Sequence, residues 1–373
     1  MSSAGGGPAA RVRVDQFVPA LLPGDAVGHH TLETHRALQT AGVAAGIWAL
    51  TVDPELADRA RPCSDFGREG GGGGGGGSLL LYQAASDSAG IVPMLLDRPE
   101  AKAISYHNIT PASYFEPFDA ATAAGLRAAA REVRDLVPRV AVALAASEFN
   151  AAGLREMGAD PVHVVPPYLG PALRAGPDPA RLAALDALGP GTRLLFVGRV
   201  APNKGHEHLV RLLAAMRGSI DAAATLWLVG PPGPPLYMGA LQRLIDRLAP
   251  GAVHLVGPVS AGELAAYYRR ADVFVCMSDH EGFGIPLVEA MRMELPVVAY
   301  DAGAVAETLG GAGVLVRTRE PTFLAELVAR VAGDAELRRE LCRRQLQRAA
   351  ELEGFPRDER LVEILTHAAL GGR

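Results

Sequence analysis

Short apolar runs alternate with stretches of helical periodicity along almost the whole of this 373-residue chain. Six runs lie in the first half, from "RVRVDQFV" to "PVHVVPP", and six lie in the second half, from "RLLFVGRV" to "AGVLVR". This alternation is typical of parallel strands that helices cover on both faces. The sequence therefore predicts an α/β chain with two doubly wound parallel sheets in series.

The length of the chain favours two domains, because one hydrophobic core seldom grows beyond about 250–300 residues. A segment rich in proline and glycine separates the two series of runs, so we place an interdomain linker at residues 171–190. The N-terminal domain is then residues 1–170 and the C-terminal domain residues 191–352. Helical periodicity in residues 353–373 predicts a closing helix, which we expect to return to the N-terminal domain.

The composition favours small-molecule chemistry. A net charge of -5, a pI near 6.1 and only 5% aromatic residues argue against a nucleic-acid partner, which requires a basic surface and stacking platforms. Cys63, Cys276 and Cys342 lie far apart, so neither disulfides nor a zinc site is indicated. No Asp-x-Asp pair occurs to hold magnesium or manganese, and we expect a metal-independent reaction without a cofactor.

The first residues lack a basic stretch followed by an apolar one, and no uncharged apolar run approaches the ~18 residues of a membrane span. We therefore expect a cytoplasmic protein. The helical stretch "AGLRAAAREVRDLVPR" places Arg127, Arg131 and Arg134 on one face, which favours a solvated face and leaves peripheral contact with the inner side of a membrane open. The glycine run in "FGREGGGGGGGGSLL" predicts a flexible surface loop.

Two cations follow the first apolar run of the second half, "RLLFVGRV". Arg199 and Lys204 lie on the loop that leads from this strand into the next helix. Ligands of open α/β sheets bind at the carboxyl ends of the strands, and two cations beside a helix N-terminus suit a diphosphate. Taken alone, the same two residues are also compatible with an ordinary solvated loop.

Two glutamates lie in "SDHEGFGIPLVEAM", which follows another apolar run. Gly282 and Gly284 let the backbone approach a ligand closely. The carboxylate of Glu281 is suited to accept hydrogen bonds from sugar hydroxyls, and that of Glu289 to accept a pair from a ribose diol. Each glutamate separately could be an ordinary helix or loop acid, but the two together with this glycine spacing indicate a site.

Together, "GRVAPNKG" and "HEGFGIPLVEA" resemble the retaining glycosyltransferases of family four, whose hallmark is two glutamates separated by seven residues. The segments "LLPGDAVGHHTLETHRALQTAG", "YHNITP" and "AYDAGAVAETLGGAGVLV" extend the resemblance along most of the chain. The resemblance implies the GT-B fold, with two doubly wound Rossmann-like domains facing across a cleft. The N-terminal domain would then bind the acceptor and the C-terminal domain the nucleotide sugar.

The resemblance also implies a role for each residue at a matching position. Arg199 and Lys204 would bind the nucleotide diphosphate, Glu281 the donor sugar and Glu289 the ribose. The remaining contacts would come from His107 near the transferred sugar, from the backbone of Gly24 and Gly28, and from the amides of Gly282, Phe283 and Gly284. The loop "PGDAVGHH" departs from the consecutive glycines of many relatives.

The implied reaction is retaining transfer of a hexosyl group from a nucleotide-diphosphate sugar to an acceptor hydroxyl. A UDP-sugar is the favoured donor and GDP-mannose the next, and the acceptor is a small molecule, a glycan or a lipid-linked molecule. The Ala, Gly, Arg and Pro bias is typical of a GC-rich bacterial genome, where the product would be a glycan, a glycolipid or a specialised metabolite.

Two other functions are compatible with parts of this sequence. An inactive nucleotide-sugar-binding partner subunit would keep the same site without turnover. A nicotinamide-dependent dehydrogenase would share the doubly wound sheets, but no GxGxxG with an acid about twenty residues further on follows the first strand.

Overall fold

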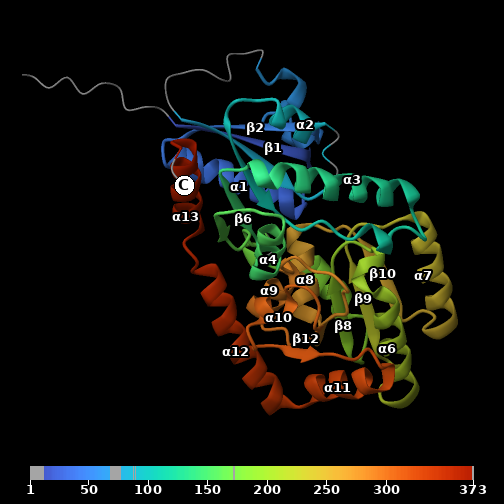
Figure 1. Ribbon diagram of the computed structural model, residues 1–373. Coiled ribbons are helices and arrows are strands. Elements are labelled where there is room, and N and C mark those ends of the chain that lie inside the picture. Colours follow the sequence, from blue (N-terminus) through green and yellow to red (C-terminus); the bar gives the residue numbers. More distant parts are fainter. Residues whose placement is uncertain (1–11, 68–76, 87, 89, 171–172, 372–373) are drawn as a thin grey trace, which may run out of the picture. The chain divides into compact units, whose positions relative to one another are not determined.

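The computed structural model describes residues 12–67, 77–86, 88, 90–170 and 173–371. The chain forms two compact units, shown as a ribbon in Figure 1. The N-terminal unit ends its first segment at Pro111, continues over Ala124–Tyr168, and is completed by residues from Pro356 onward. The C-terminal unit comprises Ala112–Ala123 and Leu169–Phe355. The chain therefore passes between the units at four points, and the linker region predicted at 171–190 counts with the C-terminal unit and carries a helix of its own.

The N-terminal unit contains a seven-stranded parallel sheet with the order β3-β2-β1-β4-β5-β6-β7. Its strands are β1 (Arg13–Leu21), β2 (Ala44–Val52), β3 (Arg61–Pro62), β4 (Ser78–Ala84), β5 (Ala101–Tyr106), β6 (Val142–Ala145) and β7 (Val162–Val164). All six apolar runs predicted as strands are strands. The short β3 was not predicted, because a two-residue, exposed edge strand has no apolar run to mark it.

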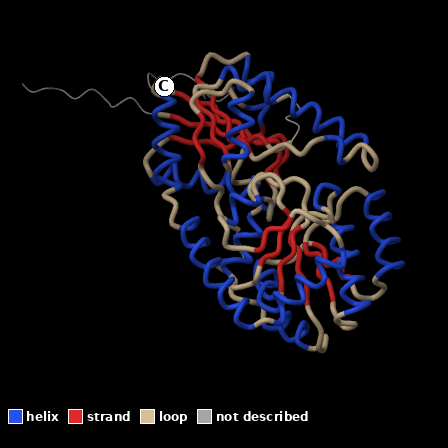
Figure 2. Tube along the Cα trace, turned by 60° about the horizontal axis from the view of Figure 1, so that its bottom comes forward, coloured by secondary structure: helices blue, strands red, loops and turns tan. Residues whose placement is uncertain are grey.

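Helices cover both faces of this sheet, as Figure 2 shows. They are α1 (Ala26–Thr40), α2 (Ile91–Leu96), α3 (Ala120–Leu136), α4 (Glu148–Glu156) and α13 (Arg357–Ala369), and α3 begins in residues that cluster with the other unit. The last helix, α13, packs against α1, β1, β4 and β5. Its backbone lies so close to Gly77 that a Cβ there would overlap the carbonyl of Ala369, so the closing helix is part of the N-terminal core.

The C-terminal unit contains a six-stranded parallel sheet with the order β10-β9-β8-β11-β12-β13. Its strands are β8 (Arg193–Val197), β9 (Thr225–Val229), β10 (Val253–Gly257), β11 (Val273–Cys276), β12 (Val297–Tyr300) and β13 (Val314–Val316). Its helices are α5 (Pro179–Asp186), α6 (His206–Ser219), α7 (Pro235–Leu248), α8 (Ala261–Arg270), α9 (Ile285–Arg292), α10 (Val305–Leu309), α11 (Pro321–Gly333) and α12 (Ala335–Glu353). Each of the six apolar runs predicted here is a strand, so the predicted pair of doubly wound sheets is confirmed.

The strand order places a switch point in each sheet. From β1 the chain goes outward to β2 and β3 and then returns to β4 on the other side, and from β8 it goes to β9 and β10 and returns to β11. Loops that leave neighbouring strands in opposite directions open a crevice at the carboxyl ends of those strands, where open α/β sheets bind ligands. The candidate sites are thus the loops after β1, β4 and β5 in one unit and after β8 and β11 in the other.

Two of the sequence-based expectations concern segments rather than the sheets. The glycine run predicted as a flexible loop falls mainly on residues 68–76, which lie outside the described part of the chain. Within the described part, none of the helices combines the length and the apolar character that a membrane crossing requires.

Candidate active site

The loop after β8 is pressed against the end of β11. It carries Arg199 and a short 3-10 helix that ends at Lys204, and it enters α6 through Gly205, which has a left-handed backbone (φ 63°). A Cβ at Gly205 would overlap the carbonyl oxygen of Met277, which follows β11. Only glycine allows this approach, so the two loops at the switch point are held together by backbone packing.

Lys204 and Glu281 form an ion pair across this junction, with 2.7 Å between Nζ and Oε1. Their side chains are only 22% and 13% exposed, so the pair is partly withdrawn from water. The backbone of Glu281 is fixed as well, because its carbonyl accepts a hydrogen bond from the amide of Ala304 at 2.9 Å. Two residues far apart in the sequence, each predicted to touch the donor, are therefore in direct contact.

Arg199 differs from Lys204 in its surroundings. Its side chain is exposed and makes no hydrogen bond or ion pair with the described residues. A hydrogen bond from Thr122 and, more weakly, the charge of Arg199 lower the pKa of Asp119, which belongs to the 112–123 segment of the same unit. Arg199 is thus a cation whose charge is available to a ligand.

The glycine-flanked residues after Glu281 lead into α9. Phe283 is buried, and its carbonyl accepts a 2.6 Å hydrogen bond from the hydroxyl of Thr308. Gly284 has a left-handed backbone (φ 88°) and is the N-cap of α9, where no side chain caps the helix. Gly282 lies between Glu281 and Phe283 and is half-buried. Pro286 has no N–H, and the amide of Leu287 donates to the carbonyl of Gly284 at 2.9 Å, so the amide of Ile285 is the one left without a side-chain acceptor in this turn.

Glu289 is buried on α9, with 5% of its surface exposed. Its Oε2 accepts a 2.7 Å hydrogen bond from the hydroxyl of Tyr268 on α8. Its Oε1 lies against Gly170, where a Cβ would overlap it. Burial raises the pKa of Glu289 and the hydrogen bond from Tyr268 partly offsets this, while burial and the nearby carboxylate raise the pKa of Tyr268. One carboxylate oxygen is thus engaged by tyrosine, and Oε1 is the oxygen without a partner among the described residues.

Arg319 is a residue that sequence reasoning did not select. It follows β13, pairs with Asp279 at 2.6 Å and donates to the carbonyl of Met277 at 3.1 Å. Its guanidinium carbon lies 3.6 Å from the ring centre of Tyr300, which follows the geometry of a cation–π contact. Arg319 therefore ties the loop that contains Glu281 to the ends of β12 and β13. Its position directly after a predicted strand was the available signal.

The 112–123 segment contributes a second contact that the sequence did not reveal. Phe118 packs edge-on against Tyr237, with 5.1 Å between ring centres, and the Tyr237 hydroxyl donates to Glu207 on α6 at 2.9 Å. His206, at the start of the same helix, is buried, and burial lowers its pKa to about 3. The beginning of α6 is thus supported by aromatic side chains and by a neutral histidine.

In the N-terminal unit, Gly24 and Gly28 lie at the turn from β1 into α1. Gly24 has a left-handed backbone (φ 71°) with open space beside its α-carbon. The amide of Gly28 donates to the carboxylate of Asp25 at 2.8 Å, because Asp25 is the N-cap of α1. The Gly28 amide is therefore used inside the helix cap, whereas the backbone at Gly24 is open.

His107 directly follows β5 and is held by side chains of the sheet. Its Nε2 lies 2.7 Å from Oε1 of Gln83 and 3.3 Å from the hydroxyl of Ser105. The ring of His30, on α1, meets it edge-on with 4.9 Å between centres. Burial lowers the pKa of His107 to about 4. The structure thus brings His107 together with the helix that starts at the Gly24–Gly28 turn.

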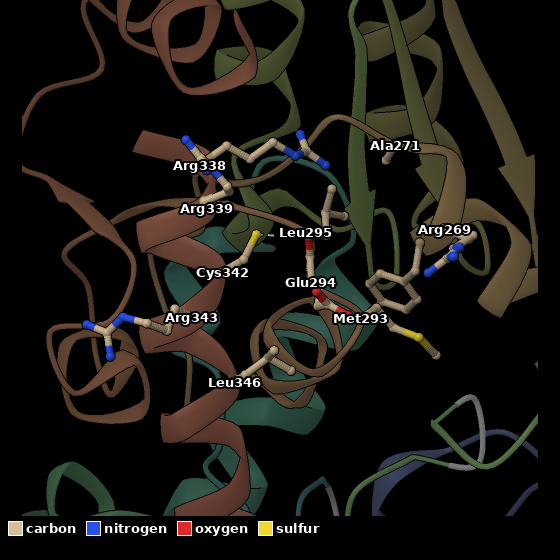
Figure 3. Close-up of a pocket in the computed structure, with 11 residues that line it drawn as sticks. Arg269, Ala271, Met293, Glu294, Leu295, Arg338, Arg339, Cys342, Arg343 and Leu346 are labelled. Carbon is tan, nitrogen blue, oxygen red and sulfur yellow. Dashed lines mark hydrogen bonds between the residues drawn. The ribbon is translucent and has the colours of Figure 1, made fainter. Parts of the chain in front are cut away.

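A large cavity lies elsewhere in the C-terminal unit (Figure 3). It measures about 630 Å³, and residues of α8, α12 and the loop between α9 and β12 line it, among them Arg269, Glu294, Arg338 and Cys342. Its loops precede β11 and β12, whereas every residue predicted for the donor follows the carboxyl end of a strand. The cavity is therefore not the candidate donor site. No cluster of metal-ligating side chains is found among the described residues.

Comparison with known protein families identifies the class of domain in the C-terminal unit. Residues 191–334 match the family model described as Glycosyl transferases group 1. The C-terminal unit thus carries a domain of this family, and the resemblance inferred from the two-glutamate segment is confirmed at that level.

Individual relatives extend this result. The chain is 34% identical over 196 residues to a D-inositol 3-phosphate glycosyltransferase of Jonesia denitrificans, covering 49% of this chain and 46% of that protein. It is 32% identical over 185 residues to a GDP-mannose-dependent alpha-(1-6)-phosphatidylinositol monomannoside mannosyltransferase of Mycobacterium tuberculosis, covering 45% and 47%. The chain spans about half the length of the curated relatives it matches.

Solved structures resemble almost the whole chain. HepE of Anabaena, in complex with UDP and glucose, gives a TM-score of 0.72 at 17% identity and covers 95% of this chain and 98% of its own. Sucrose-phosphate synthase of Thermosynechococcus elongatus gives 0.71 at 20% identity, with 95% and 97% covered. At such identities the likeness establishes the fold, which is the predicted GT-B fold.

Proposed function

We propose that this chain is a retaining, metal-independent glycosyltransferase that transfers a hexosyl group from a nucleotide-diphosphate sugar to an acceptor hydroxyl. The observation that carries the proposal is the contact between Lys204 and Glu281 at the switch point of a glycosyl transferases group 1 domain. Arg199 and Glu289 lie on the same two loop–helix connections, one after β8 and the other after β11. Four residues predicted to touch one donor therefore occur on two adjacent strand ends.

The positive charges after β8 are suited to stabilise a nucleoside diphosphate as a leaving group. As the bond between the sugar and the diphosphate breaks, negative charge grows on the phosphate oxygens. Lys204 is already oriented by Glu281, and Arg199 has no competing partner among the described residues, so both cations can stabilise that charge with little rearrangement. The amide of Ile285, at the start of α9, adds one backbone donor that no side chain caps.

The two glutamates would bind the two sugar rings of the donor. Glu281 would accept hydrogen bonds from the hydroxyls of the transferred sugar while its other oxygen keeps Lys204 in place. Glu289 would bind the ribose through Oε1, since Oε2 is engaged by Tyr268. His107 would face the transferred sugar from the N-terminal unit, and Gly24 would offer its backbone to the diphosphate.

The relatives support two donor classes. HepE was solved with UDP and glucose, and the Mycobacterium tuberculosis relative is named for GDP-mannose. We favour a UDP-sugar and place GDP-mannose second. Relatives are also named for inositol phosphate and for a phosphatidylinositol mannoside, so we infer a hydroxyl of a polar small molecule, a glycan or a lipid-linked molecule as acceptor, in a bacterial pathway.

The first experiment measures thermal unfolding with UDP, GDP, ADP and NAD, each with and without EDTA. A ligand at a hundred times its dissociation constant adds roughly 2.7 kcal/mol, which gives a clear rise in Tm. We expect UDP or GDP to raise Tm equally with and without EDTA, and the variant Glu289→Gln to abolish the rise. A rise with NAD alone, or with none of the four, would refute the proposal.

A second candidate is a nucleotide-sugar-binding subunit without turnover. The use of the Gly28 amide inside the Asp25 cap favours it, because that amide is then withdrawn from a diphosphate. Incubation with labelled UDP-sugars and GDP-mannose separates the two functions. Release of the nucleoside diphosphate, by transfer or by slow hydrolysis, supports the enzyme, and tight donor binding with no release supports the subunit.

A further inference from the structure

A chain of hydrogen-bonded side chains crosses the interior of the N-terminal unit. Nε2 of Gln16, on β1, donates to the backbone carbonyl of Thr31 on α1 at 3.1 Å. Nε2 of Gln83, on the neighbouring strand β4, donates to Oε1 of Gln16 at 2.7 Å. Oε1 of Gln83 in turn lies 2.7 Å from Nε2 of His107. Gln16, Thr31 and Gln83 are all fully buried, so water does not compete for these groups.

The direction of every bond in this chain is determined by its first member. A backbone carbonyl can only accept, so Gln16 must present its amide nitrogen to Thr31 and its oxygen to Gln83. Gln83 must then present its nitrogen to Gln16 and its oxygen to His107. Reversing either amide would place two acceptors or two donors against each other in a buried site, and each unmatched buried group costs free energy. His107 therefore meets an acceptor and must donate from Nε2.

We propose that Gln83, oriented by Gln16 and the Thr31 carbonyl, fixes His107 as the neutral tautomer protonated on Nε2. Nδ1 then has the only lone pair of the ring. It has no hydrogen-bond partner among the described residues and is not one of the fully buried unpaired atoms. Gln16 and Gln83 are positioning residues that act through His107.

The neutral state follows from the surroundings of the ring. The titratable ring of His30 lies edge-on against it, and no carboxylate among the described residues bonds to it. Burial therefore disfavours the imidazolium, in agreement with the lowered pKa of His107. A neutral ring with its one proton engaged cannot donate to a phosphate. It can only accept, and the group it suits is a hydroxyl.

This assignment refines the role of His107, and that part rests on the proposed function. His107 would accept a hydrogen bond from a hydroxyl of the transferred sugar or of the acceptor through Nδ1, and it would contribute no proton to the leaving diphosphate. The tautomer itself does not depend on the proposed function, because it is set by contacts within one unit.

The direct test is a long-range proton–nitrogen NMR spectrum of the ¹⁵N-labelled full chain at neutral pH. The protonated nitrogen of a neutral histidine resonates far from the unprotonated one, and Nε2 correlates strongly with both carbon-bound ring protons whereas Nδ1 correlates strongly with only one. The chain has ten histidines, and the signals lost in His107→Asn assign this ring. We expect the Nε2-protonated pattern. A proton on Nδ1, or an imidazolium, overturns the proposal.

Variants test the part played by glutamine. Gln83→Met keeps the length of the side chain and removes the acceptor, so we expect both tautomers of His107 to appear. Gln345→Met is the matched control, because Gln345 is also a fully buried glutamine with two hydrogen bonds, to Val297 and Leu295, in the other unit. This control should leave the His107 signals unchanged. An unchanged spectrum in Gln83→Met overturns the role of Gln83, and if that variant does not fold, the wild-type spectrum alone decides.

Kinetics then connect the tautomer to transfer. With a donor identified by thermal unfolding, Gln83→Met should lower kcat by about threefold to tenfold, the loss expected for one hydrogen bond, with little change in the KM for the donor. The control Gln345→Met should keep the wild-type kcat. Absence of transfer by the wild-type chain would refute the proposed function and leave the tautomer result intact. Equal kcat in Gln83→Met and the wild type would refute the functional role of the tautomer alone.

Discussion

The two units hold their candidate site residues by different physical means. In the C-terminal unit the residues are charged and paired: Lys204 with Glu281, and Arg319 with Asp279. In the N-terminal unit they are neutral and hydrogen-bonded, as the connection from His107 to Gln83 shows. Ion pairs at a partly open edge suit a ligand that carries charge, whereas a buried neutral network suits recognition of hydroxyls by geometry. Under the proposed function, the C-terminal unit would bind the charged part of the donor and His107 of the N-terminal unit would bind a hydroxyl.

The largest effect is expected for Glu281→Gln. The amide would lack the negative charge that pairs with the ammonium group of Lys204 and would accept more weakly from sugar hydroxyls, so kcat/KM for the donor should fall at least about 100-fold. Steady-state kinetics of donor consumption measure it. Glu326→Gln is the matched control, because Glu326 is an exposed helix acid of the same unit. Similar kinetics for Glu281→Gln and Glu326→Gln would contradict a role of the Lys204–Glu281 ion pair in binding the donor.

The second-largest expected effect is a fall in the free energy of unfolding as the pH is lowered. It should arise from the buried, neutral histidines of the N-terminal unit. Burial lowers the pKa of His107 from 6.5 to about 4, so between these values the unfolded chain binds a proton that the folded chain refuses. The free energy of unfolding must therefore fall as the pH falls from 6.5 to 4, by up to about 3 kcal/mol from this residue. Buried His30, whose pKa is also lowered, acts in the same direction.

Urea unfolding at a series of pH values measures this slope. His107→Gln should flatten it, and His367→Gln, a change at an exposed position of α13, should leave it as steep as in the wild type. An equally steep slope in His107→Gln would mean that the ring is charged in the folded chain.

A smaller pH dependence of the free energy of unfolding, of opposite sign, is expected from Glu289. Burial raises the pKa of its folded state above 4.5, so between 4.5 and the raised value the folded chain keeps a proton that the unfolded chain has released. The free energy of unfolding should therefore fall as the pH rises through this window. Glu289→Gln keeps an acceptor for Tyr268 and removes the titration, so it should stabilise the chain at neutral pH.

The same variant should lose affinity for the nucleoside diphosphate, which calorimetric titration measures. A gain in stability together with a loss of binding would mark Glu289 as a group kept for function at a cost to folding. Loss of both stability and binding would instead identify it as a structural residue.

The smallest effect is expected for Arg199→Ala. Its side chain is exposed and has no partner among the described residues, so the free energy of unfolding should change by less than about 0.5 kcal/mol. The affinity for UDP or GDP should fall by about tenfold at low salt and by less at high salt, because an exposed cation is screened. Arg330→Ala, at an exposed position of α11, is the control and should change neither quantity.

Sequence reasoning succeeded where the signal is local. Twelve strands were marked by apolar runs. Arg199, Lys204, Glu281 and Glu289 were selected because they lie on two short segments directly after such runs, and their roles stay a prediction. It failed where the partner is distant. Tyr268 lies 21 residues before Glu289, and Gln83 lies 67 residues after Gln16, so only packing brings them together. A glutamine inside "RVDQFV" or "LLLYQA" was nevertheless a usable signal, since a polar residue within a buried strand needs a buried partner.

The passage of the chain between its units bears on how such proteins can be recombined. Residues 112–123 belong with the C-terminal unit although they lie between strands of the other, and α13 belongs with the N-terminal unit although it ends the chain. A gene cut once near residue 170 would separate α13 from β1 and β4, against which it packs. A chimera that exchanges the N-terminal unit should therefore transplant the N-terminal segment and the last helix as a pair.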